Sequence, residues 1–159
     1  MIRKATAADF NYLYKLYMHP QVNPFLLYEM MDANSFKPIF DELLSKGVKY
    51  VFEYGGEPIG MFKLIPLQYR NAHIAYLGGV AIDPAFAGRG YGFTMLTEAI
   101  AYAKAIGLLR VELSVATGNQ KAIALYEKAG FEKEGVFKKF SYLKSEDRYV
   151  DEAFMAWLA

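Results

Sequence analysis

The 159-residue sequence contains no cysteine, which excludes disulfide bonds, zinc sites with thiolate ligands and a thiol nucleophile. It also lacks an excess of charge: 18 Lys and Arg face 17 Asp and Glu, a formal net charge of +1. A dedicated nucleic-acid-binding protein needs clustered cations, so we expect no nucleic-acid partner. No apolar run approaches the ~18 residues of a membrane span, and the first residues, MIRKA, lack the apolar stretch of a signal peptide. We therefore expect a cytoplasmic protein with no membrane partner.

The chain is instead rich in apolar and aromatic residues. Hydrophobic residues make up 54% of it, with 13 tyrosines, 12 phenylalanines and one tryptophan. A domain of this length buries roughly 70% of its unfolded surface, and we find neither repeat nor linker. We expect a single domain spanning residues 1–159, in which many tyrosine hydroxyls need a partner or solvent.

Hydrophobic periodicity and turn residues predict a mixed α/β domain in the order β-α-α-β-β-β-α-β-α-β-β. Gly47 suits the end of the second helix, and Gly55-Gly56 predicts a hairpin. Gly78-Gly79 inside a strand predicts a bulge or a close backbone approach. We expect strands at 2–5, 48–54, 58–67, 72–82, 110–117, 131–143 and 148–158, and helices from Thr6 to His19, from Asn34 or Ser35 to Lys46, at 90–106 and at 120–128.

The most informative segment is VAIDPAFAGRGYG at residues 80–92, where a strand ends in Asp-Pro and glycines alternate as a helix begins. Glycine lets the backbone curl closely, and the N–H groups of a helix N-terminus favour an anion. A pyrophosphate is the natural occupant; the alternative is a turn that only permits tight packing. The spacing G-x-G-x-G matches neither the dinucleotide fingerprint G-x-G-x-x-G nor the P-loop.

This segment resembles the signature of the GNAT superfamily of acyl-CoA-dependent N-acetyltransferases, which runs Gln or Arg, two residues, Gly, one residue, then Gly or Ala. Residues 89–92 (RGYG) match it, whereas Ala87 stands where Gln or Arg is usual. The resemblance implies a single-domain GNAT-like fold with a mixed, mostly antiparallel sheet flanked by helices, and acetyl-CoA as co-substrate; we expect no metal. It implies that the pyrophosphate is bound by Gly88, Arg89, Gly90, Tyr91, Gly92 and Phe93, and the pantetheine arm by Val80, Ala81 and Ile82.

A second block, NQKAIALYEKAGF at residues 119–131, is similar to the family segment N-x-x-A-x-x-x-Y-x-x-x-G-F, and the two blocks occur in the family's order. Residues 149–155 also resemble a bacterial branch that contains amino-acid and protein N-terminal acetyltransferases. Seven residues fall about 20° short of two helical turns, so Asn119 and Tyr126 are predicted to share one helical face.

Tyr126 is our candidate general acid, because a phenol of pKa ~10 is protonated at neutral pH and can give its proton to a leaving thiolate. The alternative is a core residue beneath the sheet. Asn119 is expected near the pantetheine. Without cysteine, a G-x-S-x-G motif or a convincing nucleophile beside a histidine, direct transfer to the substrate amine through a ternary complex is favoured over an acyl-enzyme. A backbone N–H near Gly79 or Val80 is our candidate donor to the oxyanion.

The general base has several candidates. His73 precedes the strand that leads to the glycine turn and has a suitable ordinary pKa, although a lone histidine there is more often only exposed. Glu29 lies in an apolar loop where burial could raise its pKa, or it is an ordinary loop carboxylate. Glu112 alternates in register with Ser114, but Ser114 occupies the position where many family members carry Glu. A chain of water molecules is the remaining alternative.

Aromatic residues concentrate between residues 10 and 28, the region that covers the acceptor side in the family. Tyr12, Phe25 and Tyr28 are our candidate pocket residues, which could hold an apolar side chain, or an ammonium group by cation–π contact. The predicted activity is transfer of acetyl from acetyl-CoA to a small amine, an amino acid or a peptide N-terminus.

Two alternative functions remain. One is a non-catalytic CoA-binding or sensing module, for which Ala87 and the unresolved base are the support. The other is a protein-lysine modifier, which we rank lower because the N-terminal loop has only Glu29 and Asp32 as acids. Fold analogy also leaves a homodimer open.

Overall fold

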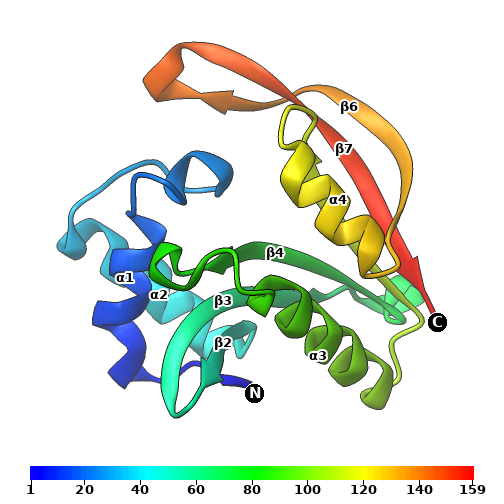
Figure 1. Ribbon diagram of the computed structural model, residues 1–159, viewed down its shortest axis with the longest axis horizontal. Helices are drawn as coiled ribbons and strands as arrows, with labels where there is room; N and C mark the ends of the chain where they lie inside the picture. Colours follow the sequence, from blue (N-terminus) through cyan, green and yellow to red (C-terminus); the bar gives the residue numbers. More distant parts are fainter. The chain divides into compact units, whose positions relative to one another are not determined.

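The computed structural model describes residues 1–159 and has seven strands and four α-helices in the predicted order (Figure 1). The strands form the order β1-β2-β3-β4-β5-β7-β6. The β4–β5 pairing is parallel, while β1–β2, β2–β3, β5–β7 and β6–β7 are antiparallel, which confirms a mixed and mostly antiparallel sheet. The strands are β1 (Ile2–Lys4), β2 (Lys49–Tyr54), β3 (Glu57–Pro66), β4 (Ile74–Ile82), β5 (Arg110–Ala116), β6 (Glu132–Leu143) and β7 (Arg148–Leu158). The helices are α1 (Phe10–Tyr17), α2 (Ala33–Lys46), α3 (Tyr91–Ala105) and α4 (Gln120–Lys128).

Contacts divide the chain into two compact units. The first comprises residues 1–64 and 79–95, and therefore β1, β2, most of β3, α1, α2, the second part of β4 and the start of α3. The second comprises residues 65–78 and 96–159, with the end of β3, the first part of β4, the rest of α3, and β5, α4, β6 and β7. The glycine turn thus belongs to the first unit, and Tyr126 to the second.

Helices α1 and α2 bury a layer of aromatic rings in the first unit. Tyr17, Phe36 and Phe40 are at most 1% exposed. The Tyr17 and Phe36 ring centroids lie 5.1 Å apart, and those of Phe10 and Phe40 lie 5.2 Å apart. Because Phe36 and Phe40 are four residues apart, they share one face of α2 and pack toward α1 and the strands. Complete burial of a side chain of this size contributes roughly 2–3 kcal/mol, so this layer is a major source of stability.

Helix α2 begins earlier than predicted. Its cap is Asp32, whose carboxylate accepts the Ser35 N–H at 2.7 Å, and its first residue is Ala33, one residue before the start predicted at about Asn34 or Ser35. An Asp cap satisfies one of the helix's orphan donors, and the apolar periodicity alone did not reveal it. The predicted end is confirmed, because Gly47 has φ 63°, the left-handed conformation that glycine adopts at a helix C-terminus.

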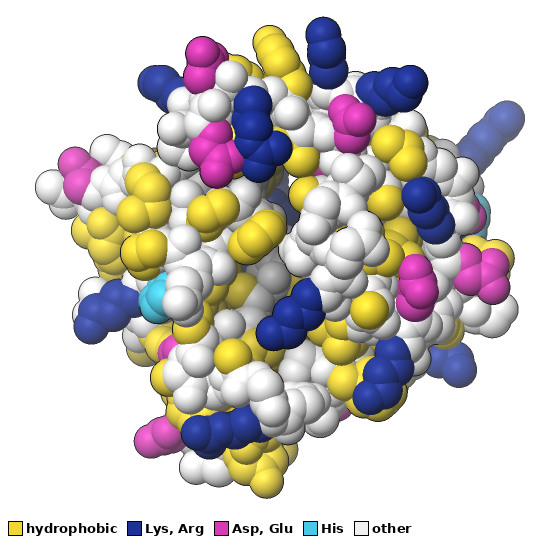
Figure 2. Space-filling model, turned by 45° about the horizontal axis from the view of Figure 1, so that its top comes forward, with side chains coloured by type: hydrophobic (Ala, Val, Ile, Leu, Met, Phe, Trp, Pro, Cys, Tyr) yellow, Lys and Arg dark blue, Asp and Glu magenta, His cyan; other side chains and the backbone are white.

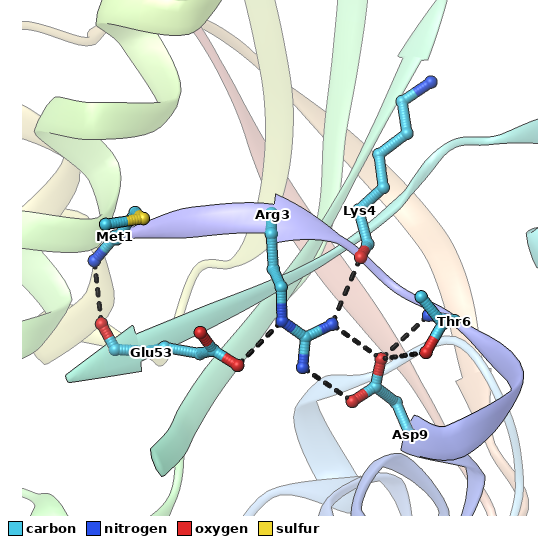
Figure 3. Close-up of polar contacts among 6 residues, drawn as sticks. All are labelled: Met1, Arg3, Lys4, Thr6, Asp9 and Glu53. Atoms are coloured by element: carbon cyan, nitrogen blue, oxygen red, sulfur yellow. Dashed lines mark hydrogen bonds and ion pairs between the residues drawn. The ribbon is translucent and has the colours of Figure 1, made fainter. Parts of the chain in front are cut away.

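A network of ion pairs connects strand β1 to Asp9, the residue that precedes α1, and to Glu53 in β2 (Figure 3). Arg3 holds the Asp9 carboxylate with two hydrogen bonds of 2.8 Å and donates to Glu53 Oε1 at 2.7 Å. The Thr6 N–H also donates to Asp9, at 2.8 Å, as the Thr6-to-Asp9 spacing predicted. The hydrogen bond from Arg3 therefore lowers the pKa of the Asp9 carboxyl, which is only 7% exposed.

In the second unit, β5 pairs with both β4 and β7. Val111, Leu113 and Val115 are buried and alternate with partly exposed residues, as predicted for one inward face of a strand. Helix α4 lies beside the β6–β7 ribbon, and most residues of β6 are exposed (Figure 1). This unit therefore contains the strand that carries Glu112, β5, and the short helix that carries Tyr126, α4.

Candidate active site

The glycine turn joins β4 to α3. Gly88 and Gly90 have φ values of 76° and 82°, and a Cβ on either would meet no atom within 4 Å. Glycine is therefore needed at both positions for the backbone conformation and not for space. The Thr94 N–H donates to the Gly90 carbonyl at 3.2 Å as α3 begins. The N-terminal end of α3, with its positive dipole end, opens on the turn and can receive an anion.

Aromatic rings lie beside this turn. The Tyr91 ring packs against Tyr54 at 4.9 Å and against Phe86 at 6.4 Å between centroids. The guanidinium of Arg89 lies 5.7 Å from the centre of the Phe86 ring and is exposed. The contact places the guanidinium of Arg89 beside the turn, where it can pair with a pyrophosphate.

The second part of β4 leads into the turn. The parallel β4–β5 ladder consists of three residue pairs, 74–76 with 110–112, so Val80, Ala81 and Ile82 take no part in it. Just beyond them, the Asp83 N–H donates to the Ile59 carbonyl in β3 at 2.8 Å. The backbone of residues 80–82 thus fits the role expected for it, pairing with an extended pantetheine arm.

Gly79 precedes these residues and confirms the predicted irregularity. Its φ is 56°, and a Cβ there would lie 3.3 Å from Tyr17 Oη and 3.5 Å from Lys49 Nζ. The backbone therefore approaches two polar side chains that sequence analysis did not single out. Lys49 donates to Tyr17 Oη at 2.7 Å, and Lys63 lies beside it in the paired strand.

Both of these lysines are buried. Lys49 is 1% exposed and Lys63 is 6% exposed. Burial, and then the charge of Lys63, moves the pKa of Lys49 well below its ordinary value, and burial lowers that of Lys63. A signal was present in the sequence: period-2 alternation puts Lys49 in phase with Val51 and Lys63 in phase with Met61, and both apolar residues belong to the core.

In the second unit, Tyr126 has a buried ring that meets Phe131 edge-on at 5.9 Å. Burial, and then the neighbouring Tyr76, raise the pKa of Tyr126, so the phenol is protonated at neutral pH. The Tyr76 and Ser114 hydroxyls share a hydrogen bond of 3.1 Å. The buried ring fits the core-residue alternative, and the protonated hydroxyl fits the general-acid hypothesis.

Asn119 does not share a helical face with Tyr126. It is the cap that precedes α4, with φ −87° and ψ 67°, and its side-chain oxygen accepts the Ala122 N–H at 3.3 Å. Seven-residue spacing places two residues on one face only where both are helical, and Asn119 is not, so the predicted shared face is wrong. Capping is a structural role that explains an Asn at this position without a ligand.

The candidate bases occupy exposed or engaged positions. His73 is exposed just before β4, at the end of the strand opposite to the glycine turn. Glu29 is also exposed, whereas the hypothesis of a desolvated base requires burial. Glu112 accepts from Arg110 at 2.9 Å, and Arg110 also pairs with Glu134 at 2.6 Å. Glu112 is thus engaged in an ion pair with Arg110, which makes it the weakest of these candidates.

The candidate acceptor residues lie in the first unit, on α1 and the loop after it. The Tyr12 hydroxyl is buried near the Asp83 carboxylate, and burial and then this neighbouring charge raise its pKa, whereas Phe25 is 62% exposed. Tyr28 is half-buried, with its ring 5.6 Å from that of Tyr17. The loop is held by Asn23, whose amide donates to the carbonyls of Tyr17 and Tyr28 at 2.9 Å each. Asn23 therefore holds the backbone of Tyr28 in place, Tyr12 is carried by α1, and Phe25 is a surface residue.

Charges of both signs are interspersed with hydrophobic side chains on the face that Figure 2 shows. None of the helices has the length and apolarity that a membrane crossing requires. The structure also places no group of three or more His, Asp or Glu side chains where they could hold a metal ion.

Known proteins resemble the chain in both sequence and structure. The sequence pattern of the acetyltransferase (GNAT) family matches residues 10–131. The L-amino acid N-acetyltransferase AaaT of Escherichia coli is 32% identical over 103 residues, which cover 64% of this chain and 62% of AaaT. The chain spans still smaller shares of other relatives that are more than 30% identical.

Two solved structures cover almost the whole chain. The ribosomal-protein-alanine N-acetyltransferase of Brucella melitensis has a TM-score of 0.83 at 25% identity, covering 100% of this chain and 99% of that one. The spermidine N-acetyltransferase of Vibrio cholerae, in complex with CoA and spermine, has a TM-score of 0.87 at 22% identity, covering 99% and 94%. The second likeness concerns the fold alone. Because the family pattern covers most of the sequence, the chain belongs to the acetyltransferase (GNAT) family.

Proposed function

We propose that the protein, as one domain over residues 1–159, transfers an acetyl group from acetyl-CoA directly to a primary amine through a ternary complex. The acceptor is a small amine, an amino acid or a peptide N-terminus. The observation that carries the proposal is the left-handed turn at Gly88 and Gly90, which opens the N-terminus of α3 directly after a strand segment outside the parallel ladder. Membership of the acetyltransferase family supports the same activity.

The residues of the first unit fit a CoA-like ligand in two ways. The turn offers backbone donors and the Arg89 cation to a pyrophosphate, and residues 80–82 offer strand-like backbone to the pantetheine. When bound, acetyl-CoA supplies an activated acyl group as a thioester. No side chain of this sequence is a convincing acyl carrier, which supports direct attack by the acceptor amine.

Tyr126 is the group that we propose protonates the departing thiolate. The phenol is protonated at neutral pH, so its proton is present when a thiolate forms, while burial raises its pKa and makes it a weaker acid than a free phenol. An amine that attacks must first lose its own proton, to His73, Glu29 or water. The exposure of both side chains favours water as the acceptor of this proton.

The test is Tyr126→Phe, assayed by thiol release from acetyl-CoA over a panel of amines. We expect turnover to fall about 100-fold or more, the usual worth of a general acid, while the calorimetric Kd for CoA stays within about twofold. Tyr69→Phe is the matched control, because Tyr69 is 91% exposed and should leave both quantities unchanged. Unchanged turnover in Tyr126→Phe would remove Tyr126 from the mechanism.

A non-catalytic CoA-binding module is the second candidate. Ala87 favours it, since this exposed residue stands in the turn where the family pattern usually has Gln or Arg and offers a ligand no side-chain hydrogen bond. CoA binding without thiol release for any amine would support this second function.

A further inference from the structure

Two lysines of the first unit are buried side by side. Lys49 in β2 and Lys63 in β3 are direct partners in the antiparallel ladder, so both side chains project from the same face of the sheet. They are 1% and 6% exposed. Lysine is almost never fully buried unless it is paired, and here two lysines occupy adjacent positions.

The contacts of both amines in the first unit are with tyrosines. Lys49 Nζ donates to Tyr17 Oη at 2.7 Å and lies 4.5 Å from the centre of the Tyr17 ring. Lys63 Nζ lies 5.3 Å from the centre of the Tyr28 ring. None of the ion pairs of the structure joins either lysine to a carboxylate. The charge of Lys63 acts on Lys49 and lowers its pKa, because two positive charges repel each other.

A buried pair of amines without an anion is costly to charge, because both ammonium groups would lose their water and repel each other, and this is why their pKa values fall. Apolar side chains at positions 49 and 63 would pack against the aromatic layer of the first unit without the cost of desolvating two amines. An anion that pairs with the Lys63 amine would offset this cost, and the Lys49 amine would add a second positive group next to Lys63. Tyr28, the ring that Lys63 faces, is half-buried in the loop that carries the candidate acceptor residues, so Lys63 is the lysine on the acceptor side.

The pair also lies close to the strand that leads to the glycine turn. A Cβ at Gly79 would be 3.5 Å from Lys49 Nζ and 3.8 Å from Lys63 Cγ. Residue 80, directly after it, begins the segment that we assign to the pantetheine. In an α-amino acid, two bonds of about 1.5 Å each separate the nitrogen from the carboxyl carbon. If the amine attacks a thioester that lies beside Val80, the carboxylate of the same molecule therefore lies near the two lysines.

We propose that Lys63, supported by Lys49, binds the carboxylate of the acceptor, so that the substrate is a free α-amino acid and not a polyamine. This inference rests on the proposed acetyltransferase function. A polyamine such as spermine would bring several cations toward two amines and no anion to neutralise them. The aromatic faces of Tyr17 and Tyr28 supply the apolar walls between which a charged hydrogen bond to Lys63 is strong.

The experiment compares each standard L-amino acid with its own α-carboxamide, and both with spermine, by thiol release from acetyl-CoA. The carboxamide keeps the size and the amine but lacks the charge. We expect the best amino acid to exceed its carboxamide by about 10- to 100-fold in kcat/KM, the loss expected for one charged hydrogen bond, and spermine to be a poor acceptor.

The variant arm uses Lys63→Met, which keeps the length of the side chain without its charge. We expect kcat/KM for the amino acid to fall about 10- to 100-fold and kcat/KM for the carboxamide to change by less than about threefold. Lys15→Met, at an exposed lysine of the same unit, is the matched control and should change neither. The calorimetric Kd for CoA and the unfolding midpoint report whether the variant is folded.

The two proposals fail in different ways. Equal use of amino acids and carboxamides by the unaltered protein, or an equal loss for both in Lys63→Met, would overturn the carboxylate site and leave the acetyltransferase intact. No thiol release with any amine, despite CoA binding, would overturn the acetyltransferase. Calorimetry of the same amino acids with the CoA complex then decides the site: binding that Lys63→Met weakens supports it, and binding that is absent or unaffected overturns it.

Discussion

Tyr17→Phe tests whether the Lys49–Tyr17 contact holds a buried amine in place. The substitution removes one oxygen from a site where both residues are at most 1% exposed, and it leaves Lys49 Nζ without its 2.7 Å partner. An unsatisfied buried polar group costs about 1–3 kcal/mol. For a protein of this size, each kcal/mol moves the midpoint by about 2–4 °C, so we expect Tm to fall by about 3–10 °C.

The double variant Tyr17→Phe with Lys49→Met removes both polar groups and fills the space with apolar atoms. We expect its stability to lie near that of the unaltered protein or above it, because nothing polar is then left unsatisfied. Thermal and urea unfolding, followed by circular dichroism, measure all three proteins and the Lys49→Met single variant. A Tyr17→Phe variant as stable as the unaltered protein, or a double variant as unstable as the sum of its parts, would refute the reasoning.

Three further predictions concern protonation, capping and the turn. Burial lowers the pKa of Lys49 and Lys63 in the folded protein below the ordinary 10.5. Between the folded-state pKa and 10.5 the unfolded chain binds more protons than the folded chain, so the free energy of unfolding should rise with pH. Urea titrations between about pH 7 and 9.5 check this rise, and Lys49→Met should reduce the slope of the free energy against pH. Asp32→Ala should lower Tm by about 2–4 °C through loss of the α2 cap, while Asp32→Asn should largely retain it. Gly90→Ala should weaken CoA binding about 5- to 30-fold by calorimetry, because the left-handed conformation costs a side chain about 1–2 kcal/mol; Gly118→Ala, where φ is not positive, should have no such effect.

Much of the fold was predictable, because its signals are local. Alternation in 110–117 identified β5 and its inward face, and Gly47 and Gly55 marked a helix end and a hairpin. The glycine turn was found in the same way, since its backbone conformations demand glycine whatever packs around them. The start of α2 was predicted about one residue late, because a cap is defined by one hydrogen bond and several polar residues compete for it.

The candidate site was less predictable, because its chemistry depends on burial. Glu29 and His73 have suitable functional groups, but the structure leaves both exposed. Asn119 matched the family segment, yet its amide oxygen caps α4. In the sequence, Lys49 and Lys63 are two lysines within predicted strands, and nothing there indicates that they are neighbours. The pairing of β2 with β3 brings the two amines together.

The sequence by itself determined the order of the elements, the glycine turn and the absence of any thiol chemistry, since these follow from residue type and spacing along the chain. The tertiary structure decided which polar groups lose their water. Desolvation depends on neighbours that are distant in sequence: Tyr17 from α1 and Gly79 from β4 enclose Lys49. Because removal from water is what shifts a pKa and makes a charge seek a partner, the acceptor chemistry that we propose could be inferred only once the strands and helices were in place.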